Sequence, residues 1–218
     1  MKIIEPKIEL LSITPDAVKL IETAGRICYK SEDKITDDSA EKFCEMIQTR
    51  NHMSVLEHAS ATFRIICDRG VSHELVRHRL ASYSQESTRY CNYSKKGMQF
   101  IQPSWISDEE LEKELNLKSG DPIPHEQMST HIWYVHCEEA ELRYNNLISE
   151  CGWTPQQARA ILPNCLKTEI VMTANFREWL HFLELRTSPQ THPDMQVIAK
   201  MIGNKLHELV PCIFKNEY

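Results

Sequence analysis

The chain has 218 residues, of which 41% are hydrophobic and 26% are charged, and its formal net charge is −6 at pH 7. A single domain commonly holds about 100 to 200 residues or slightly more, so we expect residues 1–218 to form one domain with a substantial core. The acidic balance argues against a protein that coats nucleic acid, because proteins that follow a phosphate backbone are usually strongly basic. Locally clustered cations are therefore expected to bind small ligands.

Membrane and secreted proteins are also disfavoured by the sequence. It has no run of about 18 apolar residues, and its first residues, MKIIEPKIELL, contain acids and a proline where a signal peptide needs an uninterrupted apolar core. We therefore expect a cytoplasmic protein with no membrane partner.

The cysteines, histidines and glycines disfavour several common kinds of site. The eight cysteines are never closer than 14 positions apart, so a disulfide or metal framework is not expected. The ten histidines have no spacing typical of a zinc site. The six glycines lie too far apart to form G-x-G-x-x-G or a phosphate loop, so a dinucleotide would be held without a Rossmann turn.

The first third of the chain predicts two helices and a strand. Residues 14–16, Thr-Pro-Asp, combine an N-cap, a proline for the first turn and a favourable acid, which predicts a helix through about Glu22 that ends before Gly25. A second helix is predicted over residues 38–48. Residues 60–67 are rich in β-branched and aromatic side chains, which is typical of a strand.

The segment from residue 71 to 81 has helical spacing. The pairs Val71/Leu75 and Val76/Leu80 are each separated by four positions, which predicts a helix with a buried apolar stripe. The last turns of this helix would carry the three cations at 77–79.

The remaining elements complete an α+β prediction. Residues 82–93 are rich in Ser, Thr, Gln and Asn and lack helical spacing, which predicts an irregular ligand-binding loop. We then predict a strand ending before Pro103, helices at 107–117 and 125–150, a strand at 167–176, and helices at 177–187 and 193–209. Helices and short strands mixed without strict alternation indicate the α+β class, as a single domain with a short, mainly antiparallel sheet.

The most informative motif is the run of three cations Arg77-His78-Arg79. Seven residues separate it from Ser87, and Arg89-Tyr90 follows two positions later. Consecutive helical residues point about 100° apart, so the three cations cannot converge on one target unless several ligands or a subunit boundary surround them. The motif therefore indicates a site for more than one anionic ligand.

The spacing Arg-His-Arg-x7-Ser resembles the signature of the flavin-dependent thymidylate synthases, the ThyX family, which methylate dUMP using reduced FAD. Three further blocks resemble family elements in the same order, and together with the signature they span roughly residues 52 to 192. They are His52-x4-Glu57-His58, Arg159-Ala-Ile-Leu-Pro163, and the stretch from Asn175 to Arg186.

The resemblance implies two sets of ligand-binding residues. Those expected to bind dUMP are Glu74, Arg77, Gln85, Glu86, Ser87, Arg89, Arg159 and Arg186. Those expected to bind FAD are His52, Ser54, Arg77, His78, Arg79, Asn175, Arg177 and His181. Glu74 and Glu86 are equally well interpreted as ion-pair partners of His78 and Arg89.

Arg186 and Ser87 are the residues expected to act at the reacting pyrimidine. Arginine offers a planar fork that can bind phosphate or the uracil edge at two points, which lysine cannot do. A nucleophilic serine needs a general base within hydrogen-bond reach, which a sequence cannot show, so Ser87 is assigned to substrate positioning.

The resemblance further implies the overall reaction. NADPH would reduce the flavin, 5,10-methylenetetrahydrofolate would supply the one-carbon unit, and dUMP would become dTMP in active sites shared between the subunits of a homotetramer. The alternative is a non-catalytic nucleotide- or RNA-binding module that uses the same arginines. The classical thymidylate synthase is disfavoured, because its nucleophilic cysteine motif is not recognisable around any of the eight cysteines.

Overall fold

The computed structural model describes residues 1–118 and 120–216. In these residues the strands are β1 Lys2–Ile4, β2 Lys7–Ile13, β3 Ser60–Asp68, β4 Ala81–Gln85, β5 Gln99–Ile101 and β6 Lys167–Asn175. The α-helices are α1 Ala17–Tyr29, α2 Ser39–Thr49, α3 Arg69–Leu75, α4 Asp108–Leu115, α5 Met128–Ser149, α6 Pro155–Ala158, α7 Phe176–Arg186 and α8 Pro193–Leu209. The 3₁₀ helices are η1 Glu32–Lys34, η2 Met53–His58, η3 Tyr93–Lys95, η4 His125–Gln127 and η5 Arg159–Ile161.

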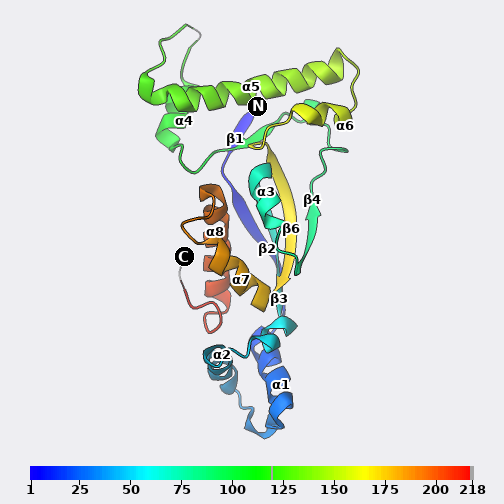
Figure 1. The fold of residues 1–218 in the computed structure, drawn as a ribbon, viewed down its shortest axis with the longest axis vertical. Helices are drawn as coiled ribbons and strands as arrows, with labels where there is room; N and C mark the ends of the chain where they lie inside the picture. Colours follow the sequence, from blue (N-terminus) through cyan, green and yellow to red (C-terminus); the bar gives the residue numbers. More distant parts are fainter. Residues whose placement is uncertain (119, 217–218) are drawn as a thin grey trace. The chain divides into compact units, whose positions relative to one another are not determined.

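The strands form two sheets, and Figure 1 labels their strands along the chain. The larger sheet has the order β2-β3-β6-β4, and β1 pairs with β5 in parallel, Lys2 opposite Gln99. Buried and partly exposed residues alternate along β3 and β6, as period-2 side-chain alternation requires. The expected α+β class with a short, mainly antiparallel sheet is confirmed.

Backbone contacts divide the chain into two compact units. Unit 1 comprises residues 1–6, 66–73 and 85–169, and unit 2 comprises residues 7–65, 74–84 and 170–218. The chain therefore passes between the units five times, and β3 and β6 each contribute residues to both. The single domain expected for residues 1–218 stays a prediction.

The core of unit 1 is built around α5. Its buried members are Tyr93, Met98, Phe100, Cys137, Ala140, Tyr144, Ala158 and Leu166. The rings of Tyr93 and Tyr144 meet edge to face with their centroids 6.0 Å apart. This core fixes the segment before β6, because Ile101 N–H donates to the carbonyl of Cys165 at 3.0 Å.

Unit 2 has an aromatic core beneath α7. Trp179 is fully buried, meets Phe63 edge to face at 5.3 Å, and donates its indole N–H to the carbonyl of Ala61 at 3.1 Å. Helix α7 also packs against α8 and η2, and α1 packs against α2 (Figure 1). These contacts hold the polar face of α7 in a fixed orientation.

The first predicted helix is wrong at both ends, because α1 begins at Ala17 and continues past Gly25 to Tyr29. Gly25 lies within α1, at the point where this helix approaches α2 closely. A Cβ atom at this position would lie 2.4 Å from Cζ of Phe43. The glycine therefore reflects helix packing and is not a stop signal.

The predicted helix over 71–81 is also wrong, because α3 ends at Leu75. Val71 and Leu75 are buried as expected, whereas Val76 is 42% exposed and Leu80 is 75% exposed. The amides of Arg77 and His78 bond three residues back, to Glu74 and Leu75, and the chain then turns into β4. The three cations therefore lie in a turn and not on a helix.

The predicted loop over 82–93 contains strand β4 in its first part. Its side chains are mostly polar, but β4 lies beside β6, and Glu86 N–H donates to the carbonyl of Glu169 at 2.9 Å. The sequence of β4 has no apolar pattern that would predict a strand, so its pairing with β6 is what identifies it. Strands β1 and β2 and helix α6 were not predicted.

The other predicted elements are confirmed, with ends shifted by only a few residues. They are the helices α2, α4, α5, α7 and α8 and the strands β3, β5 and β6. In the described part of the chain, every helix is too short or too polar to cross a membrane.

Candidate functional site

The turn that follows α3 separates the three consecutive cations. Arg77 and Arg79 are exposed, whereas His78 is only 5% exposed. The hydroxyl of Tyr83 lies 2.8 Å from the carbonyl oxygens of both Leu75 and His78, and its single proton is shared between them. This contact from β4 holds the turn, so the histidine faces inward and the two arginines face solvent.

His78 lies between two charged side chains of unit 2, Glu178 and Arg186, and is hydrogen-bonded to both. Its Nδ1 lies 3.2 Å from Oε1 of Glu178, and Arg186 donates its Nε–H to Nε2 at 3.0 Å. A guanidinium can only donate, so Nε2 must carry the lone pair and Nδ1 the proton. The arrangement therefore requires neutral His78 in the Nδ1–H form.

The electrostatics of His78 agree with this neutral form. Burial lowers the pKa of His78 below its usual 6.5, and the Arg186 charge lowers it further, while the hydrogen bond to Glu178 acts in the opposite direction. The net shift is downward. His78 is therefore neutral at pH 7 and available as an acceptor.

Arg186 is held by Glu74 as well as by His78. Its Nη1 donates to Oε2 of Glu74 at 2.8 Å and its Nη2 donates to the carbonyl of Glu74 at 3.1 Å. A guanidinium has five N–H groups, and these contacts use one on each nitrogen. Within the described residues, one N–H on each terminal nitrogen remains for a ligand, and Glu74 pairs with Arg186 and not with His78.

A cavity of about 450 Å³ in unit 2 brings together three residues predicted to bind FAD. His52 reaches it from the N-cap of η2, Ser54 from η2 itself and Arg177 from α7, although α7 is far from η2 in the sequence. The Tyr29 ring lies nearly parallel to the His52 ring, with centroids 6.4 Å apart, and its hydroxyl lies 3.2 Å from Nδ1. Arg177 bonds Glu57 at 2.6 Å beside this cavity.

The lining of this cavity suits a flavin. Such a ligand combines a flat aromatic ring with polar edges and a phosphate, and it needs aromatic or apolar walls with a few fixed polar groups. Tyr29, Met53 and Val55 supply the walls, and the other lining residues include His52, Ser54 and Arg177. The residues present therefore fit the group that the sequence implied.

Two further residues expected to bind FAD lie on α7 or at its start. Asn175 is the N-cap of the helix, and its side-chain oxygen accepts from the Glu178 amide at 2.8 Å. His181 is exposed, and its ring centroid lies 6.0 Å from that of His78. The cap leaves the Asn175 side-chain NH₂ to donate elsewhere.

The predicted nucleotide residues of unit 1 begin with Gln85 and Glu86. The Gln85 amide donates to the hydroxyls of Ser72 at 2.9 Å and Thr168 at 3.2 Å. Glu86 accepts from Lys167 Nζ at 3.0 Å and from the Tyr93 hydroxyl at 3.0 Å. Glu86 therefore pairs with Lys167 and not with Arg89, which was one of the two interpretations of this residue.

Ser87 and Arg89 shape the loop after β4. The Ser87 hydroxyl accepts from the Arg89 amide at 3.3 Å, so its observed partner is a backbone group and not a histidine. Arg89 donates its Nε–H to Oε1 of Gln156 at 3.0 Å. Gln156 lies on α6, which leads directly into η5 and Arg159, so this bond joins the loop to the segment that carries the second predicted phosphate-binding arginine.

The structure thus assembles two groups of predicted site residues, each within one unit. Unit 2 contains Glu74, Arg77, His78, Arg79 and Arg186 with His52, Ser54, Asn175, Arg177 and His181, and unit 1 contains Gln85, Glu86, Ser87, Arg89 and Arg159. Their ligand-binding roles stay predictions. Sequence reasoning missed Glu178, Tyr29 and Gln156, and only Glu178, next to Arg177, lies inside a block that carried the resemblance.

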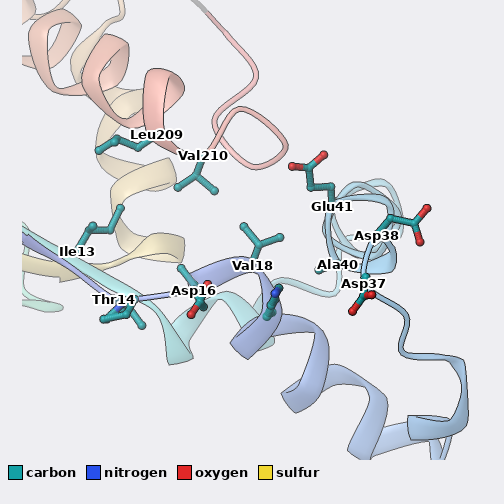
Figure 2. A pocket seen from close by; sticks show the side chains of 13 residues that line it. Ile13, Thr14, Asp16, Val18, Asp37, Asp38, Ala40, Glu41, Leu209 and Val210 are labelled. Atoms are coloured by element: carbon teal, nitrogen blue, oxygen red, sulfur yellow. The ribbon is translucent and has the colours of Figure 1, made fainter.

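A second cavity in unit 2, of about 570 Å³, is lined by none of the predicted site residues. Figure 2 shows apolar side chains such as Ile13 and Val210 on one side and Asp38 and Glu41 of the α2 region on the other. Four carboxylates and one lysine line it. This acidic lining disfavours a nucleotide phosphate because like charges repel.

The cysteines are all free thiols. The Sγ atoms of Cys137 and Cys165 lie 3.7 Å apart, and this contact, together with burial, raises the pKa of Cys137. Burial also raises the pKa of Cys67. Across residues 1–118 and 120–216, no group of three His, Cys, Asp or Glu side chains is arranged to hold a metal ion.

Comparison with known proteins places the chain in one family. A family model described as thymidylate synthase complementing protein matches residues 9–212. The flavin-dependent thymidylate synthase of Geobacter sulfurreducens is 33% identical over 217 residues, covering 96% of this chain and 86% of that protein. That of Corynebacterium aurimucosum is 34% identical over 199 residues, covering 89% and 78%.

A solved structure shares the fold. The UMP/dUMP methylase PolB from Streptomyces cacaoi, bound with 5-Br dUMP, matches with a TM-score of 0.79 at 23% sequence identity, covering 99% of this chain and 96% of that one. The fold expected from the signature is therefore confirmed. Since the family model and the relatives cover nearly the whole chain, it belongs to the flavin-dependent thymidylate synthase family of enzymes.

Proposed function

We propose that this chain converts dUMP to dTMP, with FAD as its flavin, 5,10-methylenetetrahydrofolate as the carbon donor and NADPH as the reductant. The observation that carries the proposal is the cavity where His52 and Ser54 meet Arg177, in the same unit as the oriented guanidinium of Arg186. Family membership supports the reaction class.

The flavin would be held by residues of unit 2. His52, Ser54 and Arg177 line the cavity, with Tyr29 as a further aromatic wall. Exposed Arg77 and Arg79 are proposed to bind its phosphates, and Asn175 and His181 to contribute around the ring. His78 is buried, and it is proposed to support this group through the contact of its ring with that of His181. When bound, FAD supplies the hydride that completes the methyl group.

The nucleotide would be held by arginine forks. Arg89 and Arg159 are proposed to bind the dUMP phosphate, assisted by Ser87 and the amides of its loop, because a guanidinium binds phosphate at two points. Gln85 and Glu86 are proposed to contact the rest of the nucleotide. Arg77 is proposed to reach either ligand.

Arg186 is proposed to act on the pyrimidine. The uracil ring reacts at C5 as an enolate, which carries negative charge on a carbonyl oxygen, and a fixed guanidinium stabilises that charge without reorganising. The two N–H groups that Glu74 and His78 leave unused suit this role. Glu74 is proposed to lie beside the same ring.

The proposed assembly is a homotetramer with shared active sites. The proposed location of the protein is the cytoplasm. Val76 and Leu80 flank the exposed arginines of the turn and are themselves 42% and 75% exposed. Exposed apolar residues next to a ligand site support contact with another subunit. The acidic net charge of −6 supports small-molecule substrates and no nucleic-acid partner.

The test is turnover by purified protein supplied with all four ligands, with dTMP identified by mass spectrometry. Omitting NADPH, the folate or dUMP one at a time, or removing the bound flavin from the protein, should abolish product. Arg177→Ala should lower the flavin absorbance of the purified protein, whereas Arg143→Ala, an exposed arginine paired with Glu139 on α5, should not. Absence of dTMP from flavin-loaded protein with every ligand present contradicts the proposed function.

A further inference from the structure

Glu178 carries a buried carboxylate and is not one of the residues proposed to bind a ligand. It lies in the first turn of α7, is 6% exposed, and its own amide is capped by Asn175. A buried charge is retained only when partners compensate its desolvation. The side-chain partner of Glu178 is Nδ1 of His78, at 3.2 Å.

The hydrogen bonds of His78 can be satisfied in only one way. Arg186 presents an N–H to Nε2, so a proton on that nitrogen would place two donors face to face at 3.0 Å. The proton must therefore lie on Nδ1, where the Glu178 carboxylate accepts it. An ionised carboxylate can only accept, so Glu178 enforces the form of His78 that Arg186 requires.

We propose that Glu178 is a positioning residue for the nucleotide site, since its carboxylate fixes His78 in the Nδ1–H form and His78 thereby fixes the plane of the Arg186 guanidinium. The inference rests on the proposed function of Arg186 at the pyrimidine. Glu178 itself acts through His78 and touches no substrate.

Two anchors are needed because one contact does not define the plane of a guanidinium. Glu74 holds the two terminal nitrogens, and His78 holds Nε on the remaining side. Without the His78 contact, the guanidinium can tilt about the line through its two hydrogen bonds to Glu74. The two N–H groups left for the ligand would then be aimed correctly for only part of the time, and pre-organised binding of developing charge would be lost.

The first experiment measures the tautomer directly and needs no turnover. Two-bond ¹H–¹⁵N correlation spectra of the ¹⁵N-labelled protein, with the His78 ring signals assigned from the backbone, should show a protonated Nδ1 and an unprotonated Nε2 near pH 7.5. A protonated Nε2 in the wild-type protein overturns the proposal. This result stands whether or not the protein forms dTMP, so it separates failure of the inference from failure of the proposed function.

The second experiment compares Glu178→Gln with Glu184→Gln. Both residues lie on α7 and both changes remove one carboxylate, but Glu184 is exposed. A glutamine at 178 can either accept or donate, so the tautomer is no longer enforced. We expect kcat/KM for dUMP to fall by about 10-fold to 100-fold in Glu178→Gln, by analogy with the carboxylates that orient metal-bound histidines, and to stay unchanged in Glu184→Gln.

A readout that separates positioning from general damage is NADPH oxidation without dUMP. It should persist in Glu178→Gln together with the flavin content, while a destabilised fold would reduce both. Glu178→Asp keeps the charge and should retain more activity toward dUMP than Glu178→Gln. Equal kcat/KM in Glu178→Gln and Glu184→Gln overturns the proposal, and if the Gln variant does not fold, the wild-type tautomer decides.

Discussion

At the scale of the residue, Arg186 makes a set of hydrogen bonds that a lysine cannot reproduce. Its side chain bonds His78 and Glu74 at three nitrogens and still leaves two N–H groups. Arg186→Lys keeps the charge but has one ammonium with three donors, so the proposed fork toward the pyrimidine is lost. We expect kcat/KM for dUMP to fall roughly 10²-fold or more, as when an oxyanion donor is removed.

The measurement is steady-state dTMP formation at varied dUMP. NADPH oxidation without dUMP should survive in Arg186→Lys, because Arg186 is not one of the residues that line the proposed flavin cavity. Arg143→Lys, at an exposed position on α5, is the matched control and should behave as wild type. An Arg186→Lys enzyme with unchanged kinetics would exclude Arg186 from the pyrimidine site.

The protonation of His78 predicts the pH at which kcat/KM for dUMP falls on the acid side of its pH profile. Glu178, Arg186 and His181 of α7 face the ring, and Tyr83 of β4 bonds its backbone. The pKa of His78 is lowered below its usual 6.5, so the neutral form that accepts from Arg186 exists above that lowered pKa and is lost as pH falls through it. We expect kcat/KM for dUMP to decline only below pH 6.5, and Glu178→Gln, which removes the influence that raises this pKa, to move the decline to still lower pH.

A pH profile of kcat/KM from pH 5 to 8 checks this sign. Movement of the acid limb to higher pH in Glu178→Gln would show that the limb belongs to another group. The Glu184→Gln profile supplies the reference, since that carboxylate is exposed on the same helix.

The residue types of the site could be predicted from the sequence, but several of their partners could not. The signature identified the cations at 77–79 and the blocks identified Arg186 and Arg177. The choice of partner depends on contacts between distant segments: Glu178 is 100 positions from His78, and Glu86 bonds Lys167 across 81 positions. Closeness in the sequence made His78 and Arg89 candidate partners of Glu74 and Glu86. In the structure, Glu74 pairs with Arg186 and Glu86 pairs with Lys167.

At the scale of the element, Gly25 tests how tightly α1 and α2 pack. Gly25→Ala gains about 1 kcal/mol of helix propensity, but its Cβ would meet the buried Phe43 ring at 2.4 Å. Overpacking of this kind costs about 1 to 3 kcal/mol. The ring must move, so we expect a net loss of stability, measured by urea unfolding.

The control for this prediction is the shorter side chain at position 43. Gly25→Ala should cost less in a Phe43→Leu background, because leucine leaves space for the new methyl group. An alanine that stabilises the wild-type background would show that the two helices separate easily at this point.

The elements that the sequence predicted well include the longest ones. Helices α5 and α8 have 22 and 17 residues, strands β3 and β6 have 9 each, and their positions are confirmed. Helix α3 is shorter than its pattern because the Tyr83 hydroxyl holds the carbonyls of Leu75 and His78 in a turn. Strand β4 carries little apolar pattern, so only its pairing with β6 reveals it.

At the scale of the whole molecule, the interleaving of the two units limits what a linear sequence reveals. The signature itself is divided, because residues 74–84 belong to unit 2 and residues 85–90 to unit 1. Arg89 and Arg186, both proposed to bind dUMP, therefore lie in different units. Which copies of these residues form one pocket in an oligomer is a question that mixing of subunits can answer.

The proposed shared pocket predicts complementation between two inactive proteins. If Arg89 and Arg186 of one pocket come from different subunits, Arg89→Ala and Arg186→Ala subunits that exchange will form some pockets with both defects and some with none. For random mixing of two chains, about a quarter of the pockets are intact, because every interface of a symmetric oligomer repeats. The dTMP-forming activity should rise from near zero toward that fraction of wild type, measured after exchange has been confirmed by native mass spectrometry. Confirmed exchange without any recovery would place both arginines in the pocket of one chain, since each mixed pocket would then still carry a defect.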